Sequence, residues 1–327
     1  MNKTVYIRKL DKDFSKDKLS AHLKESISKI GLDKDFSNAK SIFIKPNLTY
    51  PYYKKGVTTS KLFIEGLVKE LRHFNNSTTI YIGEGEAGYS SFSMTNALKT
   101  MGFLELEKYP NVEILNLSEH LSREIELETT KGGFKINLPR LLLDDVDFSI
   151  SCPVPKVHAM TGISLAFKNL WGCLPDNMRL KNHYMFDYII SKIAQSLKFK
   201  YAFLDGKYGL NENGPMAGKP VELDWFVASN SMGAFDYIIT QMMGISWKKI
   251  RHLRVAFDYG YIPSDNEIII DGDPKGLKKE FNLKRNLWNY PAFLAFRSKK
   301  LTYFFYLSKW ANILHKAMYL VRKKPIE

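Results

Sequence analysis

Two hydrophobic periods alternate along the first 120 residues. Short apolar runs typical of strands occur near residue 4 and at 41–47, 78–85 and 112–117. Between them, apolar residues recur every three or four positions, as at Leu19, Leu23, Ile27 and Ile30, which predicts helices at about 16–30, 60–74 and 93–101. Strands that alternate with helices pair in parallel. The pattern therefore predicts an α/β fold with a mostly parallel sheet flanked by helices.

The segment 123–139 departs from this rhythm. Two alternating runs flank Lys131-Gly132-Gly133 and predict a β-hairpin that projects from the sheet. Further along, apolar runs at 147–153 and 201–206 predict two strands, and helical spacing predicts helices at 234–243 and 247–259. At 327 residues the chain is long enough for one or two domains. We expect an α/β core over 1–280, either one unit or two lobes (1–150 and 151–280), and a tail over 281–327.

The charge of the chain is concentrated in that tail. The whole sequence carries a net charge of +14, and residues 281–327 hold ten Lys or Arg against one acid. Aromatic residues alternate with the lysines at helical spacing, which predicts a basic amphipathic helical tail. Such a helix packs its aromatic face on the core or lies on an anionic membrane surface. Single-stranded nucleic acid ranks last as a partner because no recognised binding motif accompanies the tail.

Cysteine content and the N-terminal residues bear on location. The two cysteines, Cys152 and Cys173, match neither a redox pair nor a metal-binding framework, which is typical of a reducing compartment. The start, MNKTVYIRKL, lacks the apolar stretch of a secretory signal, and no window is apolar enough for a spanning helix. The sequence therefore predicts a cytoplasmic protein that attaches peripherally to a membrane if the tail binds lipid.

Polar residues collect where the predicted strands end. They are Lys45 and Asn47 after the strand at 41–45, Glu84 and Glu86 in GEGEAG, Lys156 and His158 after 147–152, and Asp205 after 201–204. Each has an ordinary structural explanation, such as a turn or a solvated strand end. Ligands of open α/β sheets bind at the carboxyl ends of strands, so their joint occurrence predicts a shared site. GEGEAG lacks the spacing of a pyrophosphate cradle, and we expect Glu84 and Glu86 to be solvated loop charges rather than metal or hydroxyl ligands.

The stretch CPVPKVHAMTGISLAFKNLWG offers an ammonium, an imidazole and a hydroxyl at Lys156, His158 and Thr161. A helix is expected over 163–170, with Thr161 or Ser164 as its N-cap. A loop before a helix N-terminus suits a phosphate or carboxylate, and Lys45 and Lys168 add cations if their side chains converge. His158 is the expected proton carrier, since histidine changes charge near neutral pH. The loop 211–220, which contains Gly214, brings backbone close to such a ligand.

Several of these segments together resemble a known family. The ordered set IKPNL (44–48), IGEGEAG (82–88), PVPKVHAMTGISLAFKNLWGCLP (153–175), FLDGKYGLNENGPMAGKPVE (203–222) and MGAFDYIITQMMGI (232–245) is similar to the uncharacterised family catalogued as domain of unknown function 362. The family is distantly similar to the nickel-pincer lactate racemases, whose active sites combine histidines and lysines. Many members carry a ferredoxin-like cysteine cluster. This chain has none, so the resemblance implies no iron-sulfur electron transfer.

The resemblance also implies a set of polar positions. Matched motif by motif, they are Lys45, Asn47, Lys156, His158, Thr161, Lys168, Asn169, His183, Asp205, Gly214, Pro215 and Asp236. An apolar residue usually stands at the position of Cys152, so we expect Cys152 to be a buried hydrophobe. His158, His183, Asp205 and Asp236 offer nitrogen and oxygen ligands, but no spacing places two of them on one helix face, and no metal site or particular cofactor is predicted.

These residues are compatible with two functions. The leading hypothesis is an enzyme acting on a small anionic molecule. In it Lys45, Lys156 and Lys168 bind a phosphate or carboxylate together with Asn47, Thr161, Asn169 and Gly214, His158 is the acid or base, and Asp205 orients a partner or binds a metal. The alternative is a binding or accessory protein that holds an anionic ligand without chemistry and docks to a membrane through its tail.

Overall fold

One large sheet forms the centre of the molecule. The computed structural model describes residues 3–11, 16–88, 91–311 and 313. Within these residues the sheet follows the order β12 (Ile268–Asp271), β1 (Lys3–Lys9), β11 (Lys219–Ser229), β10 (Phe199–Asn211), β7 (Phe148–Cys152), β2 (Ser41–Pro46), β3 (Thr79–Glu84) and β4 (Val112–Asn116). The pairs from β10 to β4 are parallel, whereas β11 is antiparallel to both β1 and β10. The predicted mostly parallel sheet is confirmed, and strands from both proposed lobes share it.

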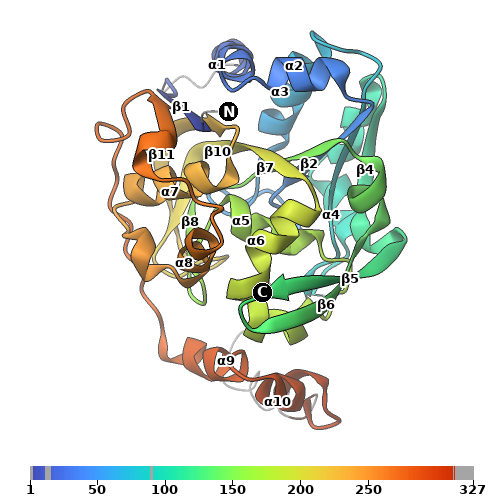
Figure 1. Ribbon diagram of the computed structural model, residues 1–327, viewed down its shortest axis with the longest axis vertical. Coiled ribbons are helices and arrows are strands. Elements are labelled where there is room, and N and C mark those ends of the chain that lie inside the picture. The colour runs from blue at the N-terminus through green and yellow to red at the C-terminus, as the bar shows by residue number, and fades with distance from the viewer. Residues whose placement is uncertain (1–2, 12–15, 89–90, 312, 314–327) are drawn as a thin grey trace.

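Alternation along each strand builds two hydrophobic cores. On β2, Ile42 and Ile44 face one core while Phe43 faces the other, because successive side chains of a strand point to opposite faces. One core is covered by α1 (Lys16–Lys29), α2 (Leu32–Asn38), α3 (Lys61–Arg72) and α4 (Met94–Thr100). The other is covered by α5 (Ala166–Asn169), α6 (Phe186–Ser196), α7 (Met232–Met242) and α8 (Arg251–Asp258). Helices therefore cover both faces of the sheet (Figure 1).

Helix α3 illustrates how the sequence determines where a helix begins and which of its faces is buried. Ser60 is its N-cap, and the Ser60 hydroxyl accepts the backbone N–H of Phe63 at 3.3 Å. Phe63, Ile64, Leu67, Val68 and Leu71 are buried, as their spacing at three and four residues requires. The helices expected at 16–30, 60–74 and 93–101 are confirmed to within a few residues. The region expected as a helix at 247–259 divides into a 3-10 turn, Trp247–Lys249, and α8.

The predicted hairpin is present as β5 (Ser122–Thr129) and β6 (Gly132–Pro139). The two strands pair with each other in an antiparallel sheet of their own, joined through Thr130 and Lys131. Gly132 has a φ of 97°, a conformation that glycine adopts without steric cost. Figure 1 shows the hairpin lying between the central sheet and the C-terminal helices α9 and α10.

Two expected boundaries are wrong. Residues expected as a loop and an early helix instead form β8 (Lys156–His158) and β9 (Gly162–Ser164), and the following helix α5 begins only at Ala166. It starts there because the Asp236 carboxylate, rather than Thr161 or Ser164, accepts the N–H groups of Ala166 and Phe167. In addition, β10 continues to Asn211, because residues beyond Asp205 pair with β11, so Asp205 lies within the strand.

The C-terminal segment contains short helices rather than one long one. They are α9 (Tyr290–Ala295), α10 (Lys299–Thr302) and a π-helical turn, Tyr303–Leu307. These turns place helical structure in the described part of the tail up to Leu307, and the basic amphipathic tail as a whole stays a prediction. The rest of the expected helix, beyond residue 313, lies outside the described residues. In the part that is described, no helix has both the length and the apolar character needed to cross a bilayer.

Phe203 tests the packing that holds β10 in the sheet. Phe203 is fully buried in the core beneath α1 and α3. Phe203→Ala should lower the free energy of unfolding by about 3–5 kcal/mol, because it leaves a cavity in a close-packed core. Urea unfolding followed by circular dichroism measures the change. Phe257→Ala is the matched control, since Phe257 is 46% exposed; equal losses for the two variants would contradict the assigned core.

Candidate functional site

The candidate site lies at the carboxyl ends of β2 and β7. These strands are neighbours, and the sheet continues to β3 and β4 on one side and to β10 on the other. At such a point the chain connections diverge and leave a crevice at the strand ends. The register pairs Lys45 with Ser151 and Pro46 with Cys152, so the segments that follow both strands meet there. Cys152 is buried and has no disulfide partner, as expected for a small hydrophobe.

Lys45 forms a buried ion pair. Its Nζ lies 2.6 Å from Oε2 of Glu84 at the end of β3 and donates to the carbonyl of Pro46 at 2.7 Å. Glu84 also accepts the backbone N–H of Leu48 at 2.9 Å. The expectation that Glu84 is a solvated loop charge is therefore wrong, because its side chain is buried and compensates Lys45. The Lys45 ammonium, expected to bind a ligand, already holds a carboxylate of the protein.

The absence of a side chain at Gly172 leaves space for this ion pair. A Cβ at Gly172 would collide with the Glu84 carboxylate and lie 2.9 Å from the Lys45 ammonium. The Gly172 carbonyl accepts the N–H of Gly85 at 2.6 Å, which ties the loop after β3 to the turn after α5. Gly85 of GEGEAG and Gly172 of NLWGC thus allow close backbone approach.

Two asparagine side chains join β2 to α5. Asn47 Nδ2 donates to Asn169 Oδ1 at 3.1 Å, and Asn169 Nδ2 donates to the Lys45 carbonyl at 3.0 Å and to Ser151 Oγ at 3.1 Å. Asn47 Oδ1 accepts from Lys156 Nζ at 3.0 Å. The structure therefore brings the predicted residues Asn47, Asn169, Lys45 and Lys156 together. Their amides fix the position of the lysines, because each amide is already engaged within the protein.

Lys156 lies on β8 and is fully buried. Its ammonium donates to Asn47 Oδ1 and, at 2.6 Å, to the Val57 carbonyl, and it has no carboxylate partner among the described residues. Burial, followed by the charge of Lys168, lowers the pKa of Lys156 to about 7. The Lys156 side chain is therefore partly deprotonated at neutral pH, whereas an exposed lysine is almost fully protonated there.

Lys168 is the second cation without a counter-ion. Its Nζ lies 5.5 Å from the centroid of the Phe186 ring, and it makes neither a hydrogen bond nor an ion pair within the described part of the chain. Burial, then the charge of Arg179, lowers the pKa of Lys168 to about 8. An anion placed beside Lys168 would meet no competing carboxylate from its immediate contacts.

His158 stands two residues after Lys156 on β8, so both side chains leave the same face of the strand. Its Nδ1 accepts the backbone N–H groups of Met160 and Thr161 at 3.2 and 3.4 Å. The ring proton of the neutral imidazole is therefore on Nε2. Burial and the charges of Lys168 and Lys156 hold the pKa of His158 well below its usual range. The expectation that His158 changes charge near neutral pH needs correction: the ring is a neutral hydrogen-bond donor there.

Two more imidazoles lie near Lys168. His183, implied by the family resemblance, stacks on Phe296 with 4.5 Å between ring centroids, and Nδ1 lies 3.0 Å from the Leu180 carbonyl. His252 on α8 was not identified from the sequence. It is fully buried, and neither of its ring nitrogens has a hydrogen-bond partner. Burial and the Lys168 charge lower the pKa of both rings to about 3, so both are neutral.

Thr161 and Gly214 shape the turn that carries His158. The Thr161 hydroxyl donates to the Ile163 carbonyl at 2.8 Å, while its N–H is one of the two that hold His158. The Gly214 carbonyl accepts the N–H of Ala159 at 3.0 Å, and a Cβ at Gly214 would collide with the Val157 carbonyl. Gly214 belongs to a cis peptide with Pro215. Both predicted residues thus position the turn through backbone contacts.

Two buried aspartates, Asp205 and Asp236, bind backbone N–H groups rather than lysine. Asp205 Oδ2 accepts the N–H of Ser60 at 2.7 Å, and burial raises the pKa of Asp205 to about 6. No hydrogen bond or ion pair joins Asp205 to Lys156 or His158 within the described residues. Asp236 accepts the first N–H groups of α5, and burial raises its pKa to about 7. Both carboxylates therefore set the position of segments that flank the site.

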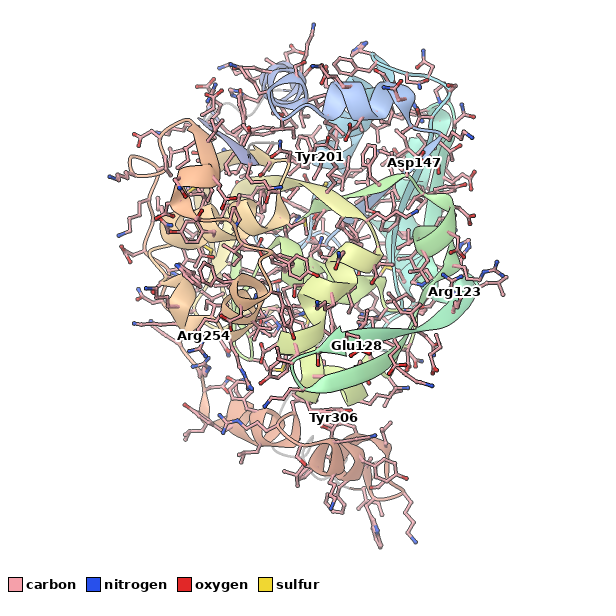
Figure 2. The ribbon with its side chains drawn as sticks, in the orientation of Figure 1. Arg123, Glu128, Asp147, Tyr201, Arg254 and Tyr306 are labelled. Carbon is pink, nitrogen blue, oxygen red and sulfur yellow. The ribbon has the colours of Figure 1, made fainter. Side chains whose placement is uncertain are left out.

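A cavity of about 590 Å³ opens beside His183, and neither His158 nor Lys168 is among the residues that line it. Its core side includes Thr161, Gly162, His183 and Phe186, and its outer side is formed by the C-terminal segment. Basic residues at its edge are Lys249, Arg251, Arg285 and Arg297. Figure 2 shows that side chains fill the region between the sheet and the C-terminal helices. The described residues contain no group of three or more His, Cys, Asp or Glu side chains that could hold a metal ion.

The buried ion pair gives a test by stability. Glu84→Gln should lower the free energy of unfolding by about 3–5 kcal/mol, because it leaves the Lys45 ammonium buried without a counter-ion. The double variant Lys45→Met/Glu84→Gln should be more stable than Glu84→Gln alone, since it removes the orphaned charge. Denaturant unfolding of the three proteins measures both differences. Glu105→Gln, at an exposed pair with Lys61, is the control and should leave stability nearly unchanged.

Comparison with known proteins gives three likenesses. The chain is 28% identical over 131 residues to the thylakoid-associated protein sll1697 of Synechocystis, a match that covers 38% of this chain and 41% of that relative. The lactate racemase apoprotein of Thermoanaerobacterium thermosaccharolyticum superposes with a TM-score of 0.47 at 14% identity, over 68% of this chain and 56% of the other. A Thermotoga maritima protein solved by structural genomics gives a TM-score of 0.38 at 14% identity, over 61% and 52%.

The family comparison covers more of the chain. A family model described as domain of unknown function (DUF362) matches residues 42–241, which include β2, the ion pair, both aspartates and the whole of β8 and α5. More than half of the chain lies in this match, and it contains the segments on which the resemblance was based except for the last four residues of 232–245. The chain therefore belongs to the DUF362 family.

Proposed function

We propose that this protein is an enzyme that binds a small carboxylate- or phosphate-bearing molecule beside Lys168. It then transfers a proton to or from that molecule. One observation carries the proposal: Lys156 is buried and Lys168 half-buried, neither has a carboxylate partner among the described residues, and each has its pKa lowered toward neutrality. A protein gains nothing in stability from such cations, because burying an unpaired charge is costly. A bound anion would compensate them.

The groups around the lysines suggest a division of roles. Lys168 is the anion ligand, since its ammonium contacts an aromatic ring and no acceptor. His158 donates a hydrogen bond from Nε2 to the bound molecule, because Nδ1 is occupied by backbone N–H groups. Lys156, with a pKa of about 7, gives and takes the proton. Lys45 supports the site through Glu84, and Asp205 through Ser60, rather than by touching the ligand.

The experiment for catalysis is hydrogen exchange in D₂O. The full-length protein is incubated with a panel of small carboxylates and phosphate esters, and proton NMR follows loss of the C–H signal next to the anionic group. We expect exchange for at least one compound, and Lys156→Met should abolish that exchange while leaving a weakened but measurable binding through Lys168. Binding without exchange for every compound would favour the alternative, a ligand-binding accessory protein, and would overturn the catalytic role.

Anion affinity should depend on pH with a definite sign. A bound anion stabilises the charged lysines, so their pKa values rise on binding and protons are taken up. Affinity is therefore full below about pH 7, where both ammoniums are already charged, and falls as pH rises through the free pKa values of about 7 and 8. The dissociation constant should rise about tenfold per pH unit for each lysine that titrates. Calorimetric titration with inorganic phosphate from pH 6 to about pH 9 measures it.

Two variants separate this linkage from surface charge. Lys168→Met should remove most phosphate binding and reduce the slope with pH, whereas Lys34→Met on the exposed surface of α2 should change neither. An affinity that does not change with pH, or equal losses in the two variants, would contradict the assignment of Lys168.

A further inference from the structure

The C-terminal segment exposes an unusual share of the apolar surface. Nine of the sixteen large hydrophobic residues that are exposed in the described structure fall between residues 287 and 313. They are Leu287, Tyr290, Leu294, Leu301, Tyr303, Phe304, Leu307, Trp310 and Ile313. Exposed apolar residues concentrated in one segment are typical of an interaction site, because water-exposed apolar groups are costly when they gather.

Cations are interleaved with these residues and acids are absent. Over 284–313 the sequence has six Lys or Arg and no Asp or Glu. Lys299 and Lys300 make no ion pair within the described part of the chain, so their charges are available to a partner. A surface that is both apolar and cationic complements a bilayer with anionic head groups, where aromatic and aliphatic side chains enter the interface and lysines meet phosphate.

A groove beside this surface has the character of a head-group site. It has a volume of about 710 Å³ and lies between β6, the turn at 181–184 and α10. Lys135, Lys181, Lys299 and Lys300 line it together with Phe134, Tyr184 and Tyr303. Lys135 and Lys181 are paired with Glu124 and Asp176, which leaves the two lysines of α10 uncompensated. Lysine ammoniums are common phosphate ligands, and aromatic walls suit the glycerol and first carbons of a lipid.

The segment is attached to the core along its other side, so the exposed side is fixed outward. Arg285 Nε donates to the Ala159 carbonyl at 2.7 Å, and Phe296 stacks between His183 and Tyr306. Ala295 and Thr302 are buried, and the Thr302 hydroxyl donates to the Ala295 carbonyl at 2.7 Å. Figure 2 labels Tyr306 between the hairpin and the C-terminal helices, on the side of the segment toward the core.

We infer that residues 284–313 form a membrane-docking surface that lies on an anionic phospholipid bilayer, with the lysine-lined groove receiving a phosphate head group. The surface is distinct from the buried lysines of the candidate site. Docking therefore requires neither a substrate nor a functional Lys168.

Sedimentation with lipid vesicles tests this inference. The full-length protein is mixed with vesicles of phosphatidylcholine alone or with about a quarter phosphatidylglycerol, and the bound fraction is measured. We expect binding only to the anionic vesicles, with weakening in high salt because exposed charges are screened. Lys299→Glu/Lys300→Glu should reduce the partition coefficient at least tenfold, by roughly 1.4 kcal/mol or more. Leu287→Ser/Trp310→Ser should reduce it by a similar factor.

Matched controls keep the test specific. Lys24→Glu/Lys34→Glu reverses two exposed charges on α1 and α2, which Figure 1 shows on the opposite end of the molecule from α9 and α10, and it should bind as the unaltered protein does. Leu121→Ser removes an exposed hydrophobe elsewhere and should also have no effect. Lys168→Met should lose phosphate binding yet keep vesicle binding, so failure of the proposed function and failure of docking remain distinguishable.

Three outcomes would overturn the inference. The first is equal binding to neutral and anionic vesicles, and the second is equal loss in the α1/α2 control and the α10 variant. The third is no vesicle binding together with concentration-dependent self-association that Leu287→Ser/Trp310→Ser abolishes. That result would identify the occupant as a second copy of this chain, measured by sedimentation velocity.

Discussion

Burial of lysine ammoniums is the constraint on which the rest of the structure depends. Lys45 and Lys156 are fully buried and Lys168 is half-buried, and Glu84 is the carboxylate that pairs with the first of them. Removing an ammonium from water is costly, so each must be compensated by a charge, by carbonyls or by a shifted pKa. The charge of Lys45 is compensated by the Glu84 carboxylate. Lys156 is compensated by a backbone carbonyl and by a lowered pKa. Lys168 has a lowered pKa and lies over the Phe186 ring. The need to compensate these ammoniums explains the residue types at Gly172, which leaves space for the ion pair, and at Asn47 and Asn169, whose amides fix the lysines.

Much of the fold could be predicted because hydrophobic period is a local property. The alternation at Ile42, Phe43 and Ile44 gives a strand with two buried faces, and the spacing in α3 gives a helix with one. The limits of β10 and α5 could not be predicted in the same way. Each depends on a distant partner: pairing with β11 extends β10 beyond Asp205, and the Asp236 carboxylate starts α5 at Ala166.

The sequence predicted the part of the candidate site that consists of polar residues at the ends of strands. Lys45, Asn47, Lys156 and Asn169 do meet, since parallel strands bring their carboxyl ends to one edge. The ion pair of Glu84 and the burial of His252 were not predicted, for different reasons. Glu84 stands in a glycine-rich acidic stretch that is typical of solvated loops, and its burial follows only from Lys45 on another strand. His252 is one polar residue on an amphipathic helix, and no sequence pattern tells a buried face of such a helix from an exposed one at a single position.

The C-terminal segment links the two regions on which function is proposed. Phe296 stacks on His183, and Arg285 holds the carbonyl of Ala159, the residue after His158. The same segment forms the outer wall of the 590 Å³ cavity. A force that draws residues 287–313 toward a surface therefore acts directly on the wall of the cavity and on the turn that orients His158. The segment is attached to the core through the stacked ring of Phe296, the hydrogen bond of Arg285 and the pairing of Lys284 with Glu212, whereas the lysines of the candidate site are held by β2, β8 and α5.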